Sequence, residues 1–497
     1  MDTIIGTRGG RLRGRLIDGV ASFKGIPYAQ PPFGANRLLA PRPVEPWHGV
    51  RDALAFGPKS PQVAYPPGIA KALAELVGSG EDCLTLNIWM PHPGKAGLPV
   101  MVWIPGGMFE FHATGATAFY DGSRFARDGV VCVTIGYRVG AEGFLYLGDG
   151  DGIANLGLLD QIAVLEWVRE NIEAFGGDPG KVTVFGESAG AMSVATLLAM
   201  PRAKGLFRRA IIQSGNTPNV NSAATAIRVG RRLAERLGVP ATRAAIAAVS
   251  PERVLQEQAQ MRADLQARPD PGFWGEVALT YLPWTPTFDG QTIPKPPIEA
   301  IRAGVAADID LLVGSNTEET RLFLLSDGTI DRLTGEAVAA MAVAYGLPAE
   351  GLSAYRAAHP GASAGELFSA IQTDWYWRIP AVRLADSHAA GARAATYMYE
   401  FAWRSPQMGG RLGAAHAVEI PFVFDTLGLG TEPMLGRNPP QPLADAMHGA
   451  WVAFAAQGDC GWSRYDAVRR RAMHFDTESW VVDDLLGREL AVWQGIR

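Results

Sequence analysis

The residues that could do chemistry are concentrated around one serine. Gly186-Glu187-Ser188-Ala189-Gly190 has the pattern GxSxG, in which small glycines leave room for a sharp turn that exposes the serine. An apolar run at 182–185 (VTVF) precedes this turn, and a helical pattern at 189–200 follows it. Because a nucleophilic serine of this type requires a strand–turn–helix context, we predict that Ser188 is a nucleophile at the edge of a sheet.

A second match to the same pattern tests how much the context matters. Gly361-Ala-Ser363-Ala-Gly365 is also GxSxG, but the residues before it, at 355–360 (YRAAHP), do not form a strand pattern. We interpret Ser363 as a loop or helix-cap serine.

A serine hydroxyl needs a neighbouring base to become a nucleophile, and the base must be oriented by a third group. Of the five histidines after Ser188, His416 lies in a glycine-rich loop at 409–416 (GGRLGAAH) that follows an apolar strand at 396–402. His448 and His474 lie in helical and strand-like patterns, where packing roles are expected. His416 is therefore the predicted base.

The acid that orients the base is expected between the serine and the histidine in the chain. The apolar run at 309–313 is followed by Glu318 and Glu319, at the strand end where such sheets place catalytic groups. Spacing alone does not choose between them. A second strand, 100–104 (VMVWI), runs into Pro105-Gly106-Gly107-Met108, whose backbone amides are candidates for an oxyanion hole.

The elements around these residues indicate the fold. Continuous apolar runs at 100–104, 130–135, 182–185, 210–213, 309–313 and 396–402 suit strands that are buried on both faces. Helical patterns such as 158–172 alternate with them, which predicts a doubly wound, mostly parallel α/β sheet. Helical and loop-rich segments are expected to cover the carboxyl ends of the strands.

Composition narrows the classes further. Of the 497 residues, 47% are hydrophobic and 19% are charged, which argues against disorder. The 45 basic and 50 acidic side chains give a net charge of −5, which argues against a nucleic-acid partner. No apolar stretch approaches the roughly 18 residues of a membrane span, and the first residues do not resemble a signal peptide. Three unpatterned cysteines indicate reduced thiols and a cytoplasmic location. Neither CxxC nor HExxH occurs, so no metal and no cofactor is expected.

Longer segments resemble a known family. Residues 175–190 (FGGDPGKVTVFGESAG) resemble the serine signature of type-B carboxylesterases, and 81–91 (EDCLTLNIWMP) resemble that family's second signature. Further matches are 23–29 (FKGIPYA), 155–161 (NLGLLDQ) and 213–215 (QSG). The resemblance is strongest to the bacterial p-nitrobenzyl esterase-like members.

This resemblance implies an α/β-hydrolase fold over 1–497 as one domain, with covering insertions at roughly 61–80, 216–306 and 319–394. It implies a triad of Ser188, Glu319 and His416, which resolves the choice of acid. The resemblance also implies that the oxyanion amides are those of Gly107, Met108 and Ala189. The residues that it implies as support for the triad are Ser214, Glu419 and Glu187. Structural ion pairs are expected between Arg37 and Glu81 and between Arg138 and Asp160.

One departure from the family concerns the oxyanion segment. Pro105-Gly-Gly-Met108 stands where the family has His-Gly-Gly-Gly or His-Gly-Gly-Ala, so a methionine side chain is expected to border the hole. Covering segments supply further side chains that we predict to line an apolar gorge. These are Tyr65, Phe111, Phe273, Trp274, Tyr281, Phe323 and Met408.

The predicted function is hydrolysis of carboxylic esters through an acyl-enzyme, on small-molecule esters with apolar groups, by a monomer or weak homodimer. One alternative is a carbamate or amide hydrolase with the same triad. The others are a non-catalytic adhesion protein of the same fold and a binding protein with an acyl-ligand pocket. The natural substrate and its chain length are left open.

The two GxSxG serines give a first test. We expect Ser188→Ala to lower kcat roughly 10⁴- to 10⁶-fold with an unchanged fold, because it removes the nucleophile. Ser363→Ala is the matched control and should retain wild-type kcat. Steady-state kinetics with circular dichroism decides, and the reverse pattern would refute the assignment.

Overall fold

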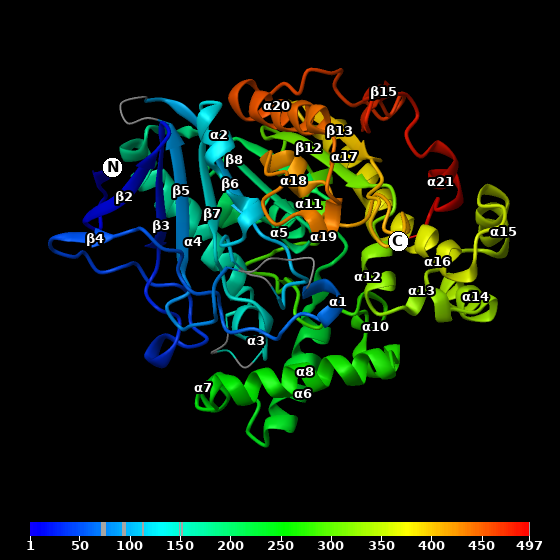
Figure 1. Cartoon of the computed structure of the whole chain (residues 1–497). Coiled ribbons are helices and arrows are strands. Elements are labelled where there is room, and N and C mark those ends of the chain that lie inside the picture. The colour runs from blue at the N-terminus through cyan, green and yellow to red at the C-terminus, as the bar shows by residue number, and fades with distance from the viewer. Residues whose placement is uncertain (71–75, 92–95, 112–113, 149, 151–152, 497) are drawn as a thin grey trace.

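The computed structural model describes residues 1–70, 76–91, 96–111, 114–148, 150 and 153–496, and a large mixed sheet runs through it (Figure 1). In spatial order, the strands are β1 (Asp2–Gly6), β2 (Arg11–Ile17), β3 (Val20–Pro27), β5 (Thr85–Pro91), β7 (Val131–Ile135), β6 (Leu98–Ile104), β8 (Gly177–Glu187), β9 (Arg209–Gln213), β12 (Asp310–Asn316), β13 (Thr396–Phe401), β14 (Ala472–Phe475) and β15 (Trp480–Val482). A short strand, β4 (Val50–Asp52), pairs with β2.

The centre of this sheet is parallel. All neighbouring strands from β7 to β14 run in the same direction, whereas β1, β2, β3 and β5 at one side and β15 at the other pair antiparallel. The prediction of a doubly wound, mostly parallel sheet is confirmed. The parallel strands all end at one edge, where the loops that follow β6, β8, β12 and β13 meet.

Strand β6 shows why its sequence is continuously apolar. Val100, Val102 and Ile104 pack into one hydrophobic core, and Met101 and Trp103 pack into a second core on the opposite face. Helices α4 (Leu156–Asn171), α5 (Ala189–Leu197) and α17 (Ile379–Gly391) contribute to the first core. Helices α2 (Ser123–Arg127), α18 (Ile420–Phe424) and α20 (Gln441–Gln457) contribute to the second. Side chains on both faces of a strand that lies between two helical layers must be apolar.

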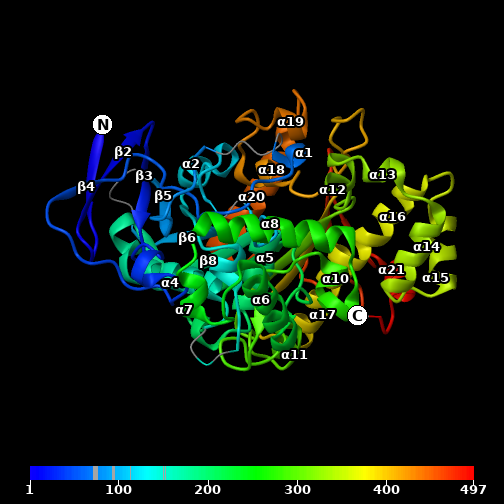
Figure 2. The ribbon, with the colours of Figure 1, turned by 90° about the horizontal axis from the view of Figure 1, so that it is seen from below.

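Two long insertions add helices outside these layers. Between β9 and β12, α6 (Ala223–Leu237) and α8 (Pro251–Ala267) pack against each other. They lie below the sheet in Figure 1 and in front of it in Figure 2, which is seen from below. Between β12 and β13 lie α12 (Arg321–Ser326), α13 (Thr329–Arg332), α14 (Gly335–Ala344), α15 (Ala349–Ala358), α16 (Ala364–Thr373) and the π-helix η5 (Asp374–Arg378). Among the described residues, no helix combines the length and the apolar character needed to cross a membrane.

The serine of the second GxSxG match lies in this helical region. Ser363 is the N-cap of α16, where its hydroxyl accepts from the Glu366 amide (3.2 Å) and Glu366 Oε2 accepts from the Ser363 amide (2.8 Å). This reciprocal pair is an exposed capping box, so the prediction of a cap serine is confirmed.

Buried ion pairs connect the loops to the sheet. Arg138 Nη2 lies 2.7 Å from Asp160 Oδ1, and both side chains are fully buried, as predicted. The predicted partner of Arg37 is wrong. Arg37 Nη2 contacts Glu142 Oε1 at 2.6 Å, because the chain after β7 brings the start of helix α3 (Gly140–Phe144), and not Glu81, beside the guanidinium.

The Arg138–Asp160 pair gives a stability test. Asp160→Asn leaves a buried guanidinium without its counter-charge, so we expect a loss of about 3–5 kcal/mol in the free energy of unfolding. Asp308→Asn is the control, because its pair with Arg393 is 73% exposed on both sides and should contribute little. Equal urea midpoints for the two variants would contradict this expectation.

Candidate active site

Ser188 lies in the turn between β8 and α5. Its backbone has φ 57° and ψ −127°, and its amide donates to the Gln213 carbonyl (3.0 Å). A Cβ on Gly190 would lie 1.9 Å from the Ile104 carbonyl oxygen, so only glycine fits against β6 at that point. Backbone strain of this kind costs of order 1–3 kcal/mol and is typical of functional turns.

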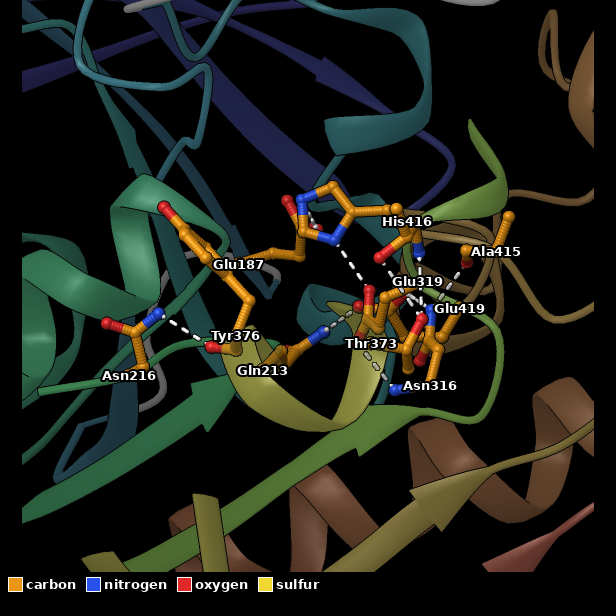
Figure 3. Close-up of polar contacts among 11 residues, drawn as sticks. Glu187, Gln213, Asn216, Asn316, Glu319, Thr373, Tyr376, Ala415, His416 and Glu419 are labelled. Atoms are coloured by element: carbon orange, nitrogen blue, oxygen red, sulfur yellow. Dashed lines mark hydrogen bonds and ion pairs between the residues drawn. The ribbon is translucent and has the colours of Figure 1, made fainter. Parts of the chain in front are cut away.

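His416 and Glu319 meet at the ends of two other strands (Figure 3). His416 Nδ1 lies 2.6 Å from Glu319 Oε2, and the His416 amide donates to the Glu319 carbonyl (3.2 Å). Glu319 Oε1 accepts from the amide of Asn316, the last residue of β12, at 2.7 Å. The Glu319 side chain is fully buried and that of His416 is 5% exposed. The contact with Glu319 positions the imidazole through its Nδ1.

The neighbouring Glu318 has a different environment. It pairs with Arg404 and with Arg321 (2.9 Å), and its Oε2 accepts from the Ala414 amide (2.9 Å). Its side chain thus braces the loop that carries His416, while Glu319 reaches the imidazole.

The second imidazole nitrogen faces Glu187. His416 Nε2 lies 3.0 Å from Glu187 Oε1, whereas no hydrogen bond joins His416 to Ser188 Oγ among the residues described. Burial alone would lower the pKa of His416, but the carboxylates of Glu187 and Glu319 outweigh it and raise that pKa to about 10. The imidazole in this position is held as the imidazolium.

Glu419 completes a cluster of three buried carboxylates. Its Oε2 accepts from Asn316 Nδ2 (2.7 Å) and its Oε1 accepts from Gln213 Nε2 (3.2 Å) (Figure 3). Burial and the charges of Glu187 and Glu319 raise the pKa of Glu419 to about 8. Ser214 follows Gln213, and its buried hydroxyl has no partner in the described part of the chain. Glu419 thus connects the carboxylate cluster to β9 and β12 through Gln213 and Asn316.

The loop after β6 approaches Ser188 from the other side. Gly107, Met108 and Phe109 have φ values of 115°, 57° and 58°, so three successive residues adopt the left-handed half of the Ramachandran map. The turn closes when the amides of Glu110 and Phe111 donate to the Gly107 carbonyl (3.1 and 2.8 Å). Two left-handed non-glycine residues in a row are costly, of order 1–3 kcal/mol each, and persist only where contacts hold them.

Two chambers meet at Ser188. The larger has a volume of about 210 Å³ and includes Met192, Arg262, Tyr281, Tyr376 and Trp377 in its wall. The smaller, about 50 Å³, includes Tyr65, Gly107, Glu187, His416 and Met434. Ile69, Met108, Ser188 and Phe323 border both. Met108 is thus one of the residues at the boundary of the two chambers. The mostly apolar walls suit a substrate with apolar groups on both sides of a reacting bond.

The gorge prediction is partly right. Tyr65, Tyr281 and Phe323 line the chambers, whereas Phe273 and Met408 are 39% and 49% exposed on the surface. Sequence reasoning missed Trp377, whose ring lies 4.4 Å from the His416 ring between centroids. The π-helix η5 places Trp377 there, and no periodic signal in the sequence indicates a π-helix.

The remaining histidine candidate and the possible metal ligands do not form a second site among the described residues. His448 Nδ1 contacts the Val423 carbonyl (2.7 Å), away from Ser188, in keeping with its predicted packing role. Over the described ranges, no group of three His, Cys, Asp or Glu side chains is placed to hold a metal ion.

Comparison with known proteins identifies the class. A model described as "Carboxylesterase family" matches residues 1–493. The para-nitrobenzyl esterase of Bacillus subtilis (strain 168) is 38% identical over 97% of this chain and 96% of its own length. The phenmedipham hydrolase of Pseudarthrobacter oxydans is 36% identical over 91% and 90%. The carboxylesterase structure from Geobacillus stearothermophilus at pH 6.2 superposes with a TM-score of 0.84, at 38% identity over 99% and 100% of the two chains.

The chain therefore belongs to the carboxylesterase family and has the α/β-hydrolase fold. It is a carboxylic ester hydrolase of the serine hydrolase type.

The contact between His416 and Glu187 gives a pH test. Glu187→Gln removes one of the two negative charges that raise the pKa of His416. Because only neutral imidazole accepts a proton, we expect the acidic limb of the kcat/KM profile to move to lower pH, by about 1–3 units. Glu166→Gln, an exposed pair with Arg202, is the control. An unshifted limb in Glu187→Gln would contradict the role of this carboxylate.

Proposed function

We propose that Ser188, Glu319 and His416 are the catalytic triad. Ser188 attacks the ester carbonyl, His416 accepts the hydroxyl proton, and Glu319 orients the imidazole and stabilises its charged form. The observation that carries this proposal is the fully buried 2.6 Å contact between Glu319 and His416, next to the strained turn of Ser188. The same imidazole then protonates the leaving alcohol, and water hydrolyses the acyl-enzyme by the reverse route.

Proton transfer requires Nε2 of His416 to turn from Glu187 to the Ser188 hydroxyl. Glu187 and Ser188 are adjacent residues of one turn, and we propose that the imidazole turns from the first to the second. Glu187 stabilises the imidazolium form of His416, which cannot accept the Ser188 proton. We infer that this contact holds the resting enzyme in that inactive, protonated form at low pH.

We further propose Glu419 and Ser214 as supporting residues. Glu419 contacts Gln213 of β9 and Asn316 of β12, and the Ser214 amide donates to the Gly314 carbonyl (2.8 Å).

We assign the oxyanion hole to the amides of Gly107, Met108 and Ala189. Ala189 is the first residue of α5, where an amide has no partner within the helix. Gly107 and Met108 lie in the strained loop on the opposite side of Ser188. Donors fixed in this way stabilise charge that develops on the carbonyl oxygen without reorganising.

The substrate we propose is a small-molecule ester with apolar groups on both the acyl and the alcohol side. The volumes of the two chambers and the aromatic side chains in their walls support it. Carbamates and amides can react with the same triad and oxyanion hole, so they are the alternative substrates.

Three further proposals concern the whole chain. We propose one domain over 1–497 in which the insertions at roughly 61–80, 216–306 and 319–394 shape the substrate chambers. We propose a cytoplasmic location, supported by the buried free thiols of Cys83, Cys132 and Cys460. A monomer or weak homodimer is proposed as well, to be measured by light scattering.

The test combines labelling with a matched substrate series. A fluorophosphonate should label Ser188, detected by peptide mass spectrometry, and should not label the Ser188→Ala variant. Turnover should fall from p-nitrophenyl ester to p-nitrophenyl carbamate to p-nitroanilide of the same acyl size. Labelling of another residue would refute the triad, and faster turnover of the carbamate or anilide would refute the ester preference.

A further inference from the structure

Two of the amides assigned to the oxyanion hole, those of Gly107 and Met108, lie in the strained loop after β6. Met108 and Phe109 are left-handed residues without the freedom of glycine. The Phe109 carbonyl accepts from the Gly140 amide (2.7 Å), which fixes one point of the loop. The Glu110 amide is held by the Gly107 carbonyl (3.1 Å), but the side chains of Met108 and Glu110 make their contacts with a residue far away in the chain.

One guanidinium from the covering helix α8 makes those contacts. Arg262 Nη1 donates to Glu110 Oε2, and Arg262 Nη2 lies 3.5 Å from Met108 Sδ. The same guanidinium lies over the Phe111 ring, 5.0 Å from its centroid. One side chain thus touches three residues of a four-residue stretch, from the side opposite to the sheet.

Helix α8 is attached to this region at a second point, one turn earlier. Gln258 Oε1 accepts from the Ala141 amide (2.8 Å), next to the Gly140 amide that binds the loop. Residues 258 and 262 face the same side of the helix. The contact of Gln258 therefore holds the part of helix α8 that carries Arg262 next to the loop.

The contact between Arg262 and Glu110 joins two opposite charges away from water. The Glu110 side chain is fully buried and that of Arg262 is 12% exposed. Within the described ranges, Glu110 Oε1 has no hydrogen-bond partner, so the guanidinium supplies the counter-charge of this carboxylate. Burial lowers the pKa of Arg262 to about 10, which leaves it cationic at neutral pH. Without it, a buried negative charge would lie two residues from an amide that must stabilise an oxyanion.

We propose that Arg262 is a positioning residue for ester hydrolysis: it clamps Met108 and Glu110 so that the loop amides stay aimed at the developing oxyanion. This inference rests on the proposed oxyanion hole. It assigns to a covering helix a part in the chemical step, in addition to shaping the chamber.

The test uses Arg262→Gln and Arg262→Lys with small neutral p-nitrophenyl esters. A misaligned donor is expected to lower kcat, so Arg262→Gln should lose about 10- to 100-fold in kcat with KM within about threefold. The inhibition constant of an alkyl trifluoromethyl ketone, which binds as a tetrahedral oxyanion adduct, should rise by the same factor. Arg262→Lys keeps the charge but not the two-pronged contact, and should show an intermediate loss.

Two controls separate this role from others. Arg253 lies on the same helix, and its side chain is half-exposed and paired with Glu257. The variant Arg253→Gln should match wild type in kcat, in KM and in the ketone inhibition constant. A double-mutant cycle adds Glu110→Gln: the double variant should be no worse than Arg262→Gln, because the buried charge that needs the clamp is gone.

Three results would overturn the inference. A lower melting temperature with unchanged kcat and ketone affinity would make Arg262 purely structural. A rise in KM for the neutral esters, with kcat and ketone affinity unchanged, would make it a substrate-binding residue. If Arg262→Gln does not fold, an unchanged ketone affinity in Arg262→Lys decides against the clamp. Failure of the fluorophosphonate to label Ser188 in the wild-type enzyme would instead overturn the proposed function.

Discussion

The buried contact between Glu319 and His416 is the constraint on which the rest of the site depends. Both groups carry charge in an environment from which water is excluded, so each must have its partners supplied by the fold. Asn316 serves both carboxylates next to it: its backbone amide binds Glu319 and its side-chain amide binds Glu419. The end of β12 must therefore lie at a defined distance from the loop after β13. The parallel sheet achieves this because its strands end at one common edge.

A second requirement is that strain be held by packing. Ser188, Met108 and Phe109 all have positive φ values without being glycine, and they lie on the two sides of the same space. Because Gly190 has no side chain, the Ser188 turn packs against β6, while the Arg262–Glu110 pair joins the opposite loop to helix α8. The sheet contacts the site on one side and helix α8 contacts it on the other. These contacts explain how the strained backbone of Ser188, Met108 and Phe109 remains in one conformation.

The sequence predicts the parts of this site that have a local signal. The apolar run, the turn and the helix around Ser188 lie within about twenty residues, so pattern alone separates Ser188 from Ser363. The choice between Glu318 and Glu319 has no such signal, because two adjacent glutamates in a turn differ only in what the fold places beside them. For the same reason the partner of Arg37, the π-helix that carries Trp377, and the contact of Arg262 with Glu110 required the tertiary structure. The general fold was predictable because burial on both faces of a strand leaves a continuous apolar run.

The contacts that build the site join residues far apart in the chain. Glu319 and His416 are separated by 97 positions, Arg262 and Glu110 by 152, and Gln213 and Glu419 by 206. Closing loops of this length costs chain entropy before any of these contacts forms, so such contacts form late in folding. Helices, whose contacts are local, can form while the imidazole is still without its carboxylates. Recovered hydrolysis is therefore a stricter measure of complete folding for this chain than recovered secondary structure, and the two should be followed separately during renaturation.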